Sequence, residues 1–202
     1  MAVKLNSVNA VLRRLGKLPV TALDTSGGST EAHVERAIDD ATDTILAKGW
    51  YFNSKWEVTA TPDSSDNILL TALESSATIY HVDSWGGDAY RHVTQRNTKL
   101  YDLDNNTDTF TGNILLTYTY AVAYTEIPIV YAEWIETLAA FNFNRQYIGD
   151  SAKDGMLRAE LVDREATARR EENESADVNV LDTTEARQLL GRPRMKNRSV
   201  YE

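Results

Sequence analysis

The sequence predicts an α+β fold: an antiparallel helical bundle with an inserted, mainly antiparallel β-sheet domain and an extended C-terminal tail. Apolar residues recur at helical spacing early in the chain and again after residue 126. Short β-branched and aromatic runs, separated by turn residues, lie between these regions. We therefore assign residues 1–50 and 126–176 to the bundle, 51–125 to the inserted domain, and 177–202 to a C-terminal docking tail with one short helix.

The first part of the bundle is predicted to contain two helices. The first covers residues 5–15 and ends at Gly16. The second begins with Ser29 or Thr30 as its N-cap and ends near Gly49, where a C-cap glycine with positive φ is favoured. Two helices alone cannot close a core, so helices from later in the chain are needed.

The stretch 48–53, Lys-Gly-Trp-Tyr-Phe-Asn, lies where the helical pattern stops and a strand-like pattern begins. Phe52, Trp56 and Val58 are spaced by even numbers of residues, which predicts that they share one face of a strand. We interpret the stretch as a structural junction and not as an active site. The residues assigned to the junction are Gly49, Trp50, Phe52 and Trp134.

Six strand-like runs are expected in the inserted domain, with turns at 85–88 and 104–106. In the last run, Ile114, Leu116, Tyr118 and Tyr120 alternate with more polar residues, which predicts one face more buried than the other. The predicted strands are 55–61, 68–70, 78–82, 90–94, 99–103 and 113–120.

Two long helices are predicted to complete the bundle. Pro128 suits the first turn of one, which fades near Gly149, and Asp150 or Ser151 can cap the next, which extends to about Ser175. The second of these helices is rich in charge and its apolar positions thin out after the middle. We expect it either to project from the bundle or to pack along a neighbouring subunit. A short helix is predicted between 182 and 191.

Composition excludes several classes of protein. The chain has 202 residues, no cysteine and a formal net charge of −9. Thiol catalysis, thiolate metal sites and disulfides are thereby excluded, and a general affinity for DNA or anionic membranes is not expected. The sequence shows no signal peptide and no run long enough to span a bilayer, so we expect synthesis in a reducing cytoplasm.

No pattern in the sequence indicates a catalytic or cofactor site. His33, His81 and His92 lack metal-ligand spacing, and no phosphate-binding glycine loop or serine nucleophile elbow is present. The acidic stretch 102–108 begins like a calcium loop, but Thr107 replaces its glycine, and a turn is the better interpretation. We predict no enzyme activity, metal or cofactor. Two carboxylates could serve glycoside hydrolysis, but carboxylates are too numerous here to be informative.

Aromatic residues concentrate in and around the predicted sheet. They could stack on carbohydrate or nucleobases, although core and subunit-interface roles are the commoner use of such residues. The aromatic residues in question are Trp50, Tyr51, Phe52, Trp56, Tyr80, Trp85, Tyr90, Tyr118, Tyr120 and Tyr124.

Three segments resemble the tail tubular protein A family of short-tailed bacteriophages of the podovirus type. The first segment is 5–20 (LNSVNAVLRRLGKLPV) and the second is 48–53 (KGWYFN). The third runs from Ile127-Pro128 through Trp134 to 141–146 (FNFNRQ) and Gly149. Their order and spacing agree across most of the chain. The second segment is the most specific of them, and the sheet region and the tail after about residue 177 match less clearly.

The resemblance implies a structural head-to-tail adaptor, or connector, in the virion tail or neck. Such adaptors form a dodecameric ring below the portal protein, continue the DNA channel and carry the nozzle, tail tubular protein B, and often the tail fibres. Assembly in the host cytoplasm, DNA that passes without specific binding, and no role for a membrane are implied. A tail-associated glycan-binding or glycan-hydrolysing protein is the alternative, and a soluble bacterial domain of unrelated role is the third possibility.

Charge then suggests where contacts form. An acidic body lining the channel would repel DNA phosphates, while the basic end of the tail would reach the portal or a neighbouring subunit. The docking candidates are Arg187, Arg192, Arg194, Lys196, Arg198 and Tyr201. The candidates for contacts within the ring, all on the charge-rich helix, are Arg158, Glu160, Arg164, Glu165, Arg169 and Arg170.

Overall fold

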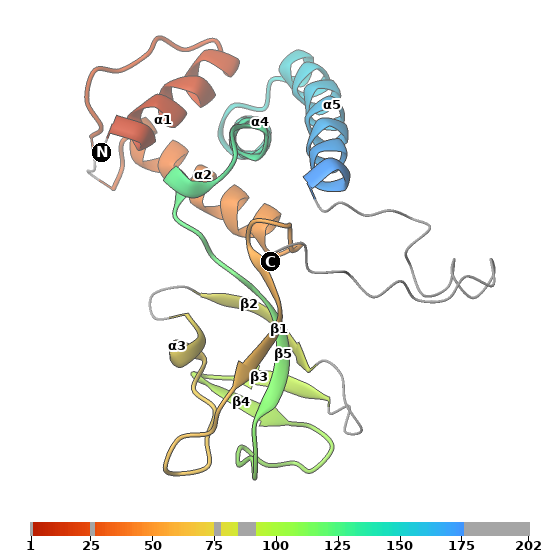
Figure 1. Ribbon diagram of the computed structural model, residues 1–202. Helices are drawn as coiled ribbons and strands as arrows, with labels where there is room; N and C mark the ends of the chain where they lie inside the picture. Colours follow the sequence, from red (N-terminus) through yellow and green to blue (C-terminus); the bar gives the residue numbers. More distant parts are fainter. Residues whose placement is uncertain (1, 25–26, 75–77, 85–91, 176–202) are drawn as a thin grey trace, which may run out of the picture.

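The computed structural model describes residues 2–24, 27–74, 78–84 and 92–175. A helical bundle lies at one end of the molecule and a small β unit at the other (Figure 1). The fold is α+β, as the sequence predicts. The tail, its short helix and the turn expected at 85–88 lie outside the described residues.

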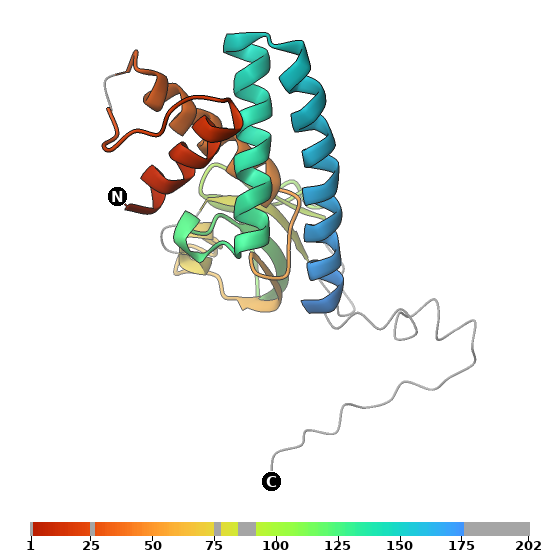
Figure 2. The same cartoon turned by 90° about the horizontal axis from the view of Figure 1, so that it is seen from above.

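The bundle is arranged around α4 (Ile129–Phe143). Helices α1 (Ala2–Arg14) and α2 (Thr30–Leu46) pack on one side of α4, and α5 (Ser151–Ser175) packs on the other (Figure 2). All four helices contribute to one hydrophobic core. Its largest members, fully buried, include Val8, Val11, Leu15, Ile45, Leu46, Tyr131 and Ile135.

Helix ends in the bundle follow the expected capping residues. Ser29 is the N-cap of α2, and its Oγ accepts a hydrogen bond from the Ala32 amide at 3.1 Å. Gly16 and Gly49, with φ of 70° and 77°, follow α1 and α2 as predicted. Asp150 caps α5, because its carboxylate accepts the amides of Ala152 and Lys153.

One turn of π-helix, η2 (Asn144–Ile148), ends α4, and Gly149 then reverses the chain into α5. Helix α5 runs back along α4, and Leu157 near its start and Ala168 near its end are both buried. The prediction that this helix projects from the bundle is therefore wrong. Small or apolar residues recur along the side facing α4 even where charge dominates the composition.

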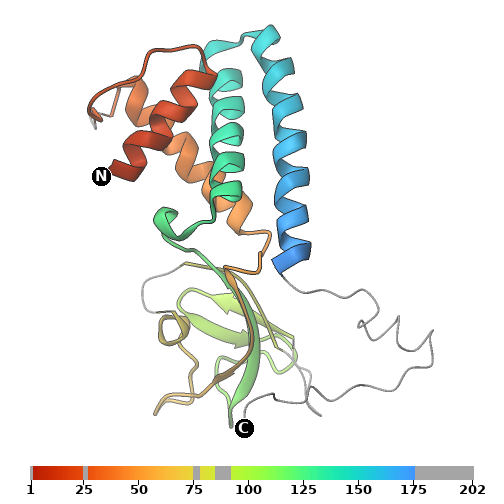
Figure 3. The ribbon, with the colours of Figure 1, turned by 45° about the horizontal axis from the view of Figure 1, so that its top comes forward.

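The β unit contains a three-stranded antiparallel sheet and a separate hairpin (Figure 3). Strand β5 (Ile114–Tyr120) lies between β1 (Ser54–Ala60) and β2 (Ile79–Ser84). Strands β3 (Val93–Arg96) and β4 (Lys99–Asp102) form the hairpin. A second hydrophobic core lies within this unit and includes Ile68, Leu100, Phe110, Leu116 and Tyr118. The predicted inner face of the last strand is thus confirmed.

Two predictions in this region are wrong. Phe52, Trp56 and Val58 do not share a face, because Phe52 precedes the strand and a bulge, with Glu57 at φ 56°, interrupts β1. The run 68–70 forms only an isolated bridge before the helical turn α3 (Leu70–Leu73). Its backbone pairs with the hairpin, since the Leu70 amide donates to the Thr98 carbonyl and the Leu100 amide donates to the Ile68 carbonyl, both at 2.9 Å. This short pairing and the burial of Ile68 and Leu70 together account for the strand-like pattern.

Candidate assembly site at the junction of bundle and sheet

The chain passes between bundle and sheet twice, from α2 to β1 and from β5 through η1 (Tyr124–Glu126) to α4 (Figure 1). The predicted junction motif occupies the first of these crossings. Gly49 lies against the second, since a Cβ built on it would be 3.0 Å from Thr119 Oγ1. A glycine is needed here for its positive φ and for this close approach.

Asn53 holds the two crossings together. Its side chain is fully buried, and its Oδ1 accepts the Trp50 amide at 2.7 Å. Its Nδ2 donates to the Leu46 carbonyl at 2.9 Å and to the Tyr120 carbonyl at 3.1 Å. The side-chain amide of Asn53 therefore forms hydrogen bonds with backbone groups at the end of α2, in the turn after it and at the end of β5.

An aromatic cluster packs the junction against the bundle. The ring of Trp50 lies 5.0 Å from that of Tyr131 and 5.6 Å from that of Trp134, and its Nε1 donates to the Ile45 carbonyl at 2.7 Å. Phe52 meets Tyr131 edge to face at 4.8 Å. Lys48 Nζ lies 4.6 Å from the centre of the Trp134 ring, a cation–π contact at the rim. Trp50, Phe52 and Trp134 thus lie in one cluster where the chain leaves the bundle.

The end of α5 closes over this cluster. Glu172 Oε2 accepts the Tyr51 amide at 3.1 Å and lies 3.1 Å from the Tyr131 hydroxyl, while Glu171 accepts the Tyr51 hydroxyl at 3.1 Å. Burial, reinforced by the charge of Glu172, raises the pKa of Tyr131, so its hydroxyl stays a donor. The C-terminal segment follows α5 at Ser175, directly beyond this contact.

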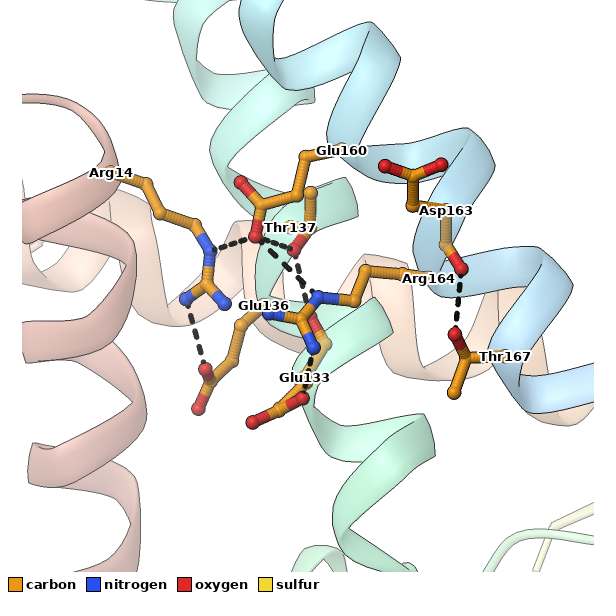
Figure 4. A network of polar contacts seen from close by, with 8 residues as sticks. All are labelled: Arg14, Glu133, Glu136, Thr137, Glu160, Asp163, Arg164 and Thr167. Carbon is orange, nitrogen blue, oxygen red and sulfur yellow. Dashed lines mark hydrogen bonds and ion pairs between the residues drawn. The ribbon is translucent and has the colours of Figure 1, made fainter. Parts of the chain in front are cut away.

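Three helices are joined by a polar network (Figure 4). Arg14 on α1 pairs with Glu136 of α4 at 3.1 Å and with Glu160 of α5 at 3.2 Å. Arg164 pairs with Glu133 and lies 3.6 Å from Glu160. Burial raises the pKa of Glu136, and Arg14 opposes that rise. The network fixes α1 and α5 on opposite sides of α4.

The six ring-contact candidates on α5 divide into two groups. Glu160 and Arg164 belong to the network within the chain. The others lie farther out: Arg169 pairs with Glu165 at 2.7 Å along the helix surface, and Arg158 and Arg170 are exposed. The docking candidates from Arg187 to Tyr201 lie outside the described residues. Neither ring contact nor docking is tested by these positions, and both stay predictions.

Residues of this site to which the sequence assigned no junction role are Asn53, Tyr51, Glu171 and Glu172. Asn53 lies within the junction motif, and asparagine side chains often hydrogen-bond backbone groups a few residues away. Glu171 and Glu172 gave no such signal, since they meet Tyr51 only through the path of α5.

Two hollows were considered as sites for a glycan. One, of about 10 Å³, is lined by Glu35, Asp39 and Tyr124 among others, but Lys4 pairs with both carboxylates and the space holds at most a water molecule. The other is an open depression of about 280 Å³ at the turn from α4 to α5. Its Asp150 caps α5, its Asp154 pairs with Arg145, and no aromatic residue lines it. The first hollow is too small for a sugar and the second lacks flanking aromatic residues, so neither meets the requirements of the glycan alternative.

The aromatic residues of the described chain are mostly packed inside. Trp50 and Tyr118 are buried, and Trp56, at 60% exposure, is the most accessible of the aromatic residues singled out from the sequence within the described ranges. Trp85 and Tyr90 lie outside those ranges. No group of three or more His, Asp or Glu side chains is placed to hold a metal ion in the part of the chain that the structure describes. No helix in that part is long and apolar enough to cross a membrane.

The helical bundle is thus joined to the small sheet through a buried junction. A family model described as Tail tubular protein matches residues 5–178 of the chain. The chain therefore belongs to the tail tubular protein family and is a structural component of a phage tail, which assembles with other phage proteins. None of the curated proteins compared with the chain matches it.

Proposed function

We propose that this protein is a head-to-tail adaptor, a ring of identical subunits below the portal of a short-tailed phage. The ring, a dodecamer, would continue the DNA channel and carry the nozzle protein and tail fibres. The match to the tail tubular family over residues 5–178 is the observation that carries this proposal. No chemical reaction is part of this role.

The fixed arrangement of the bundle supports a mechanical role. Helices α1, α4 and α5 are joined by ion pairs, and α2 is joined to the sheet through Asn53. A subunit that transmits load between two neighbours needs such cross-connections, because a loose hinge would let the channel walls shift. The junction is then the part that sets the angle between bundle and sheet in every copy.

Charge gives the channel and the tail different roles in the proposal. With a net charge of −9, a channel lined by the body of the protein repels DNA phosphates and lets the genome slide without binding. The basic C-terminal segment docks on the portal or on a neighbouring subunit through its positive charge. Arg158, Glu165, Arg169 and Arg170, which lie outside the internal network, are the candidates for contacts between subunits.

Copy number in purified virions tests the adaptor role. Quantitative mass spectrometry of the source phage, normalised to the portal protein, is expected to give a ratio near one to one. A chain that is absent from virions, or present in only a few copies per particle, would refute the ring and direct attention to a non-virion role.

Portal attachment tests the role of the tail separately. Charge reversal of Arg192, Arg194, Lys196 and Arg198 should weaken binding to the portal while the circular dichroism spectrum stays that of the wild type. A matched reversal of Arg96 and Lys99 in the β3–β4 hairpin should leave attachment intact. Undiminished attachment of the tail variant would show that these residues are not the docking element.

A further inference from the structure

The C-terminal end of α5 is weakly held within its own helix. No residue of α5 after Ala168 is buried. Glu171, Glu172 and Glu174 lie at this end, and the last turn has no basic residue. Negative charge is unfavourable there, because the helix dipole places partial negative charge at the C-terminus of a helix. This end of the helix therefore draws its stability from contacts with other parts of the chain.

Those contacts are made to the crossing from α2 to β1. The end of α5 lies beside this crossing (Figure 3). Glu172 accepts the Tyr51 amide and Glu171 accepts the Tyr51 hydroxyl, both at 3.1 Å. We refer to residues 171–175 as the strap, because they lie across the chain at the point where it leaves the bundle.

The strap can open without leaving a buried group unpaired. The Tyr131 hydroxyl donates to Glu172, but it also lies 3.1 Å from the Ala168 carbonyl and so keeps a partner. Glu171 and Glu172 are half-buried at the surface, where water can replace the groups that they accept. Each such hydrogen bond adds little net stability. Opening of the strap is therefore a local event that leaves the core of the bundle intact.

The closed strap holds the backbone that leads into the sheet. Tyr51 lies three residues before β1 begins at Ser54. The other polar contacts described at the crossing connect the β unit to α2, through Asn53 and through the Tyr80 hydroxyl, which donates to Asp43. The contacts of Tyr51 with Glu171 and Glu172 connect the same crossing to α5. Opening the strap would therefore remove a restraint on the angle between bundle and sheet.

Residues 176–202 continue the chain from the strap. A contact that changes where this segment leaves the bundle acts first on residues 171–175 and, through Glu172, on Tyr51. We propose that the strap couples the point where the C-terminal segment leaves the bundle to the orientation of the β unit. A closed strap holds the sheet at one angle, and an open strap lets the angle vary. The proposal rests on the proposed function, in which docking of the C-terminal segment acts on the strap.

Distances between spin labels test whether the strap controls the sheet. The full-length chain has no native cysteine, so Asp40→Cys on α2 and Thr59→Cys on β1, both exposed, can carry the labels. Double electron–electron resonance should give one narrow distance distribution for this labelled protein. Asn173→Pro breaks the last turn from an exposed position and should broaden the distribution. Asn173→Ala favours the helix and should leave the distribution narrow.

Side-chain variants separate the contacts of the strap from the helix itself. Glu171→Ala with Glu172→Ala removes both acceptors while it favours the helix, and it should broaden the distribution as Asn173→Pro does. Glu174→Ala removes the same charge from an exposed position of the last turn and is the matched control. An unchanged distribution in the double variant, or equal broadening by Glu174→Ala, would overturn the proposal.

Coupling must also act in the reverse direction. Tyr51→Phe removes the hydroxyl that Glu171 accepts and keeps the ring. Hydrogen exchange of the amides of residues 171–175 should then become about threefold to tenfold faster, as expected for the loss of one hydrogen bond. Tyr147→Phe, a change in η2 before the other end of α5, should leave these amides unaffected.

The conservative Tyr51→Phe variant keeps the proposal testable even if the proline or alanine variants do not fold. Unchanged exchange of residues 171–175 in Tyr51→Phe would show that the crossing and the strap are independent, which contradicts the proposal. Each of these failures leaves the adaptor role standing, because the copy number in virions judges that role separately.

Discussion

The bundle and the β unit are held together in different ways. The bundle has a large core in which four helices and several aromatic residues meet, and ion pairs join its outer helices to α4. The β unit has a smaller core of its own, with three strands and a hairpin. Between the two, buried polar contacts centred on Asn53 join the ends of α2 and β5, and Tyr80 of β2 packs on the bundle core. The helical bundle is therefore the larger and more extensively connected part of the molecule, and the junction determines the orientation of the sheet relative to it.

The largest expected loss of stability comes from removing the Trp50 ring, which lies at the centre of the aromatic cluster. Trp50→Ala deletes the ring between Tyr131 and Trp134 and should lower the free energy of unfolding by about 3–5 kcal/mol. Trp56→Ala, at an exposed position, should change it by less than about 0.5 kcal/mol. Urea unfolding followed by circular dichroism gives both values. Equal losses of unfolding free energy in the two variants would mean that burial of Trp50 in the bundle core does not stabilise the protein.

Asn53→Ala should be the next most damaging change. It leaves the Trp50 amide and the Leu46 and Tyr120 carbonyls without their buried partner, which costs about 2–3 kcal/mol. Hydrogen exchange should show faster exchange around the junction than in the centre of either core. Asn142→Ala, on an exposed part of α4, provides the control. A loss spread evenly over the whole molecule would argue against a distinct junction.

Two glycine substitutions should act in opposite directions. Gly49→Ala places a Cβ at positive φ and 3.0 Å from Thr119 Oγ1, so it should destabilise by about 1–2 kcal/mol. Gly155→Ala, within α5 and with open space around it, should stabilise by about 1 kcal/mol. Thermal unfolding of the two variants beside the wild type would reveal the signs. Stabilisation by Gly49→Ala would show that the close crossing at the junction does not exist.

Acid should destabilise the β unit before it destabilises the helical bundle. Backbone hydrogen bonds lower the pKa of Asp63 and of Asp104, so their stabilisation is present above the unfolded pKa and is lost as pH falls through the folded value. Burial raises the pKa of Glu136 in the bundle, so its protonation in acid favours the folded bundle. Asp150, whose pKa the Lys153 amide lowers, is an exception confined to the start of α5.

Amide resonances followed from neutral pH to well below the usual aspartate pKa of about 4 would measure this difference, because the lowered pKa values of Asp63 and Asp104 place their protonation at the acid end. Signals near Glu136, whose pKa is raised, should change at higher pH and keep their dispersion, whereas signals from the turns at Asp63 and Asp104, whose pKa values are lowered, should change at lower pH and lose theirs. Asp63→Asn should flatten the change at its own turn. A bundle that loses dispersion before the β unit would reverse the comparison.

Much of the bundle could be predicted because its signals are local. Ser29, Gly16, Gly49 and Asp150 each mark a helix end through their own hydrogen bonds or φ, and the structure confirms all four positions. The path of α5 was harder, because contact with α4 depends on sparse small residues such as Ala168 within a charged sequence. Most of the charged residues of α5 lie on its outer faces, so the charge content of the sequence does not show how the helix packs against α4.

The β unit and the site were less predictable for a different reason. The bulge at Glu57 is set by the pairing of β1 with β5, which lies far along the chain. The contact between Glu172 and Tyr51 likewise joins residues that are far apart in the sequence. Tyr51 and Phe52 pack on the bundle core, so we propose that the boundary between the two units lies after Asn53 and not at residue 50.

A symmetric cryo-electron microscopy reconstruction of the portal vertex in purified virions tests the central claim most directly. The account predicts a closed ring of this chain below the portal, with each bundle held to the next and the angle between bundle and sheet the same in every copy. A vertex without the chain, or one holding an isolated copy outside any ring, would contradict the account.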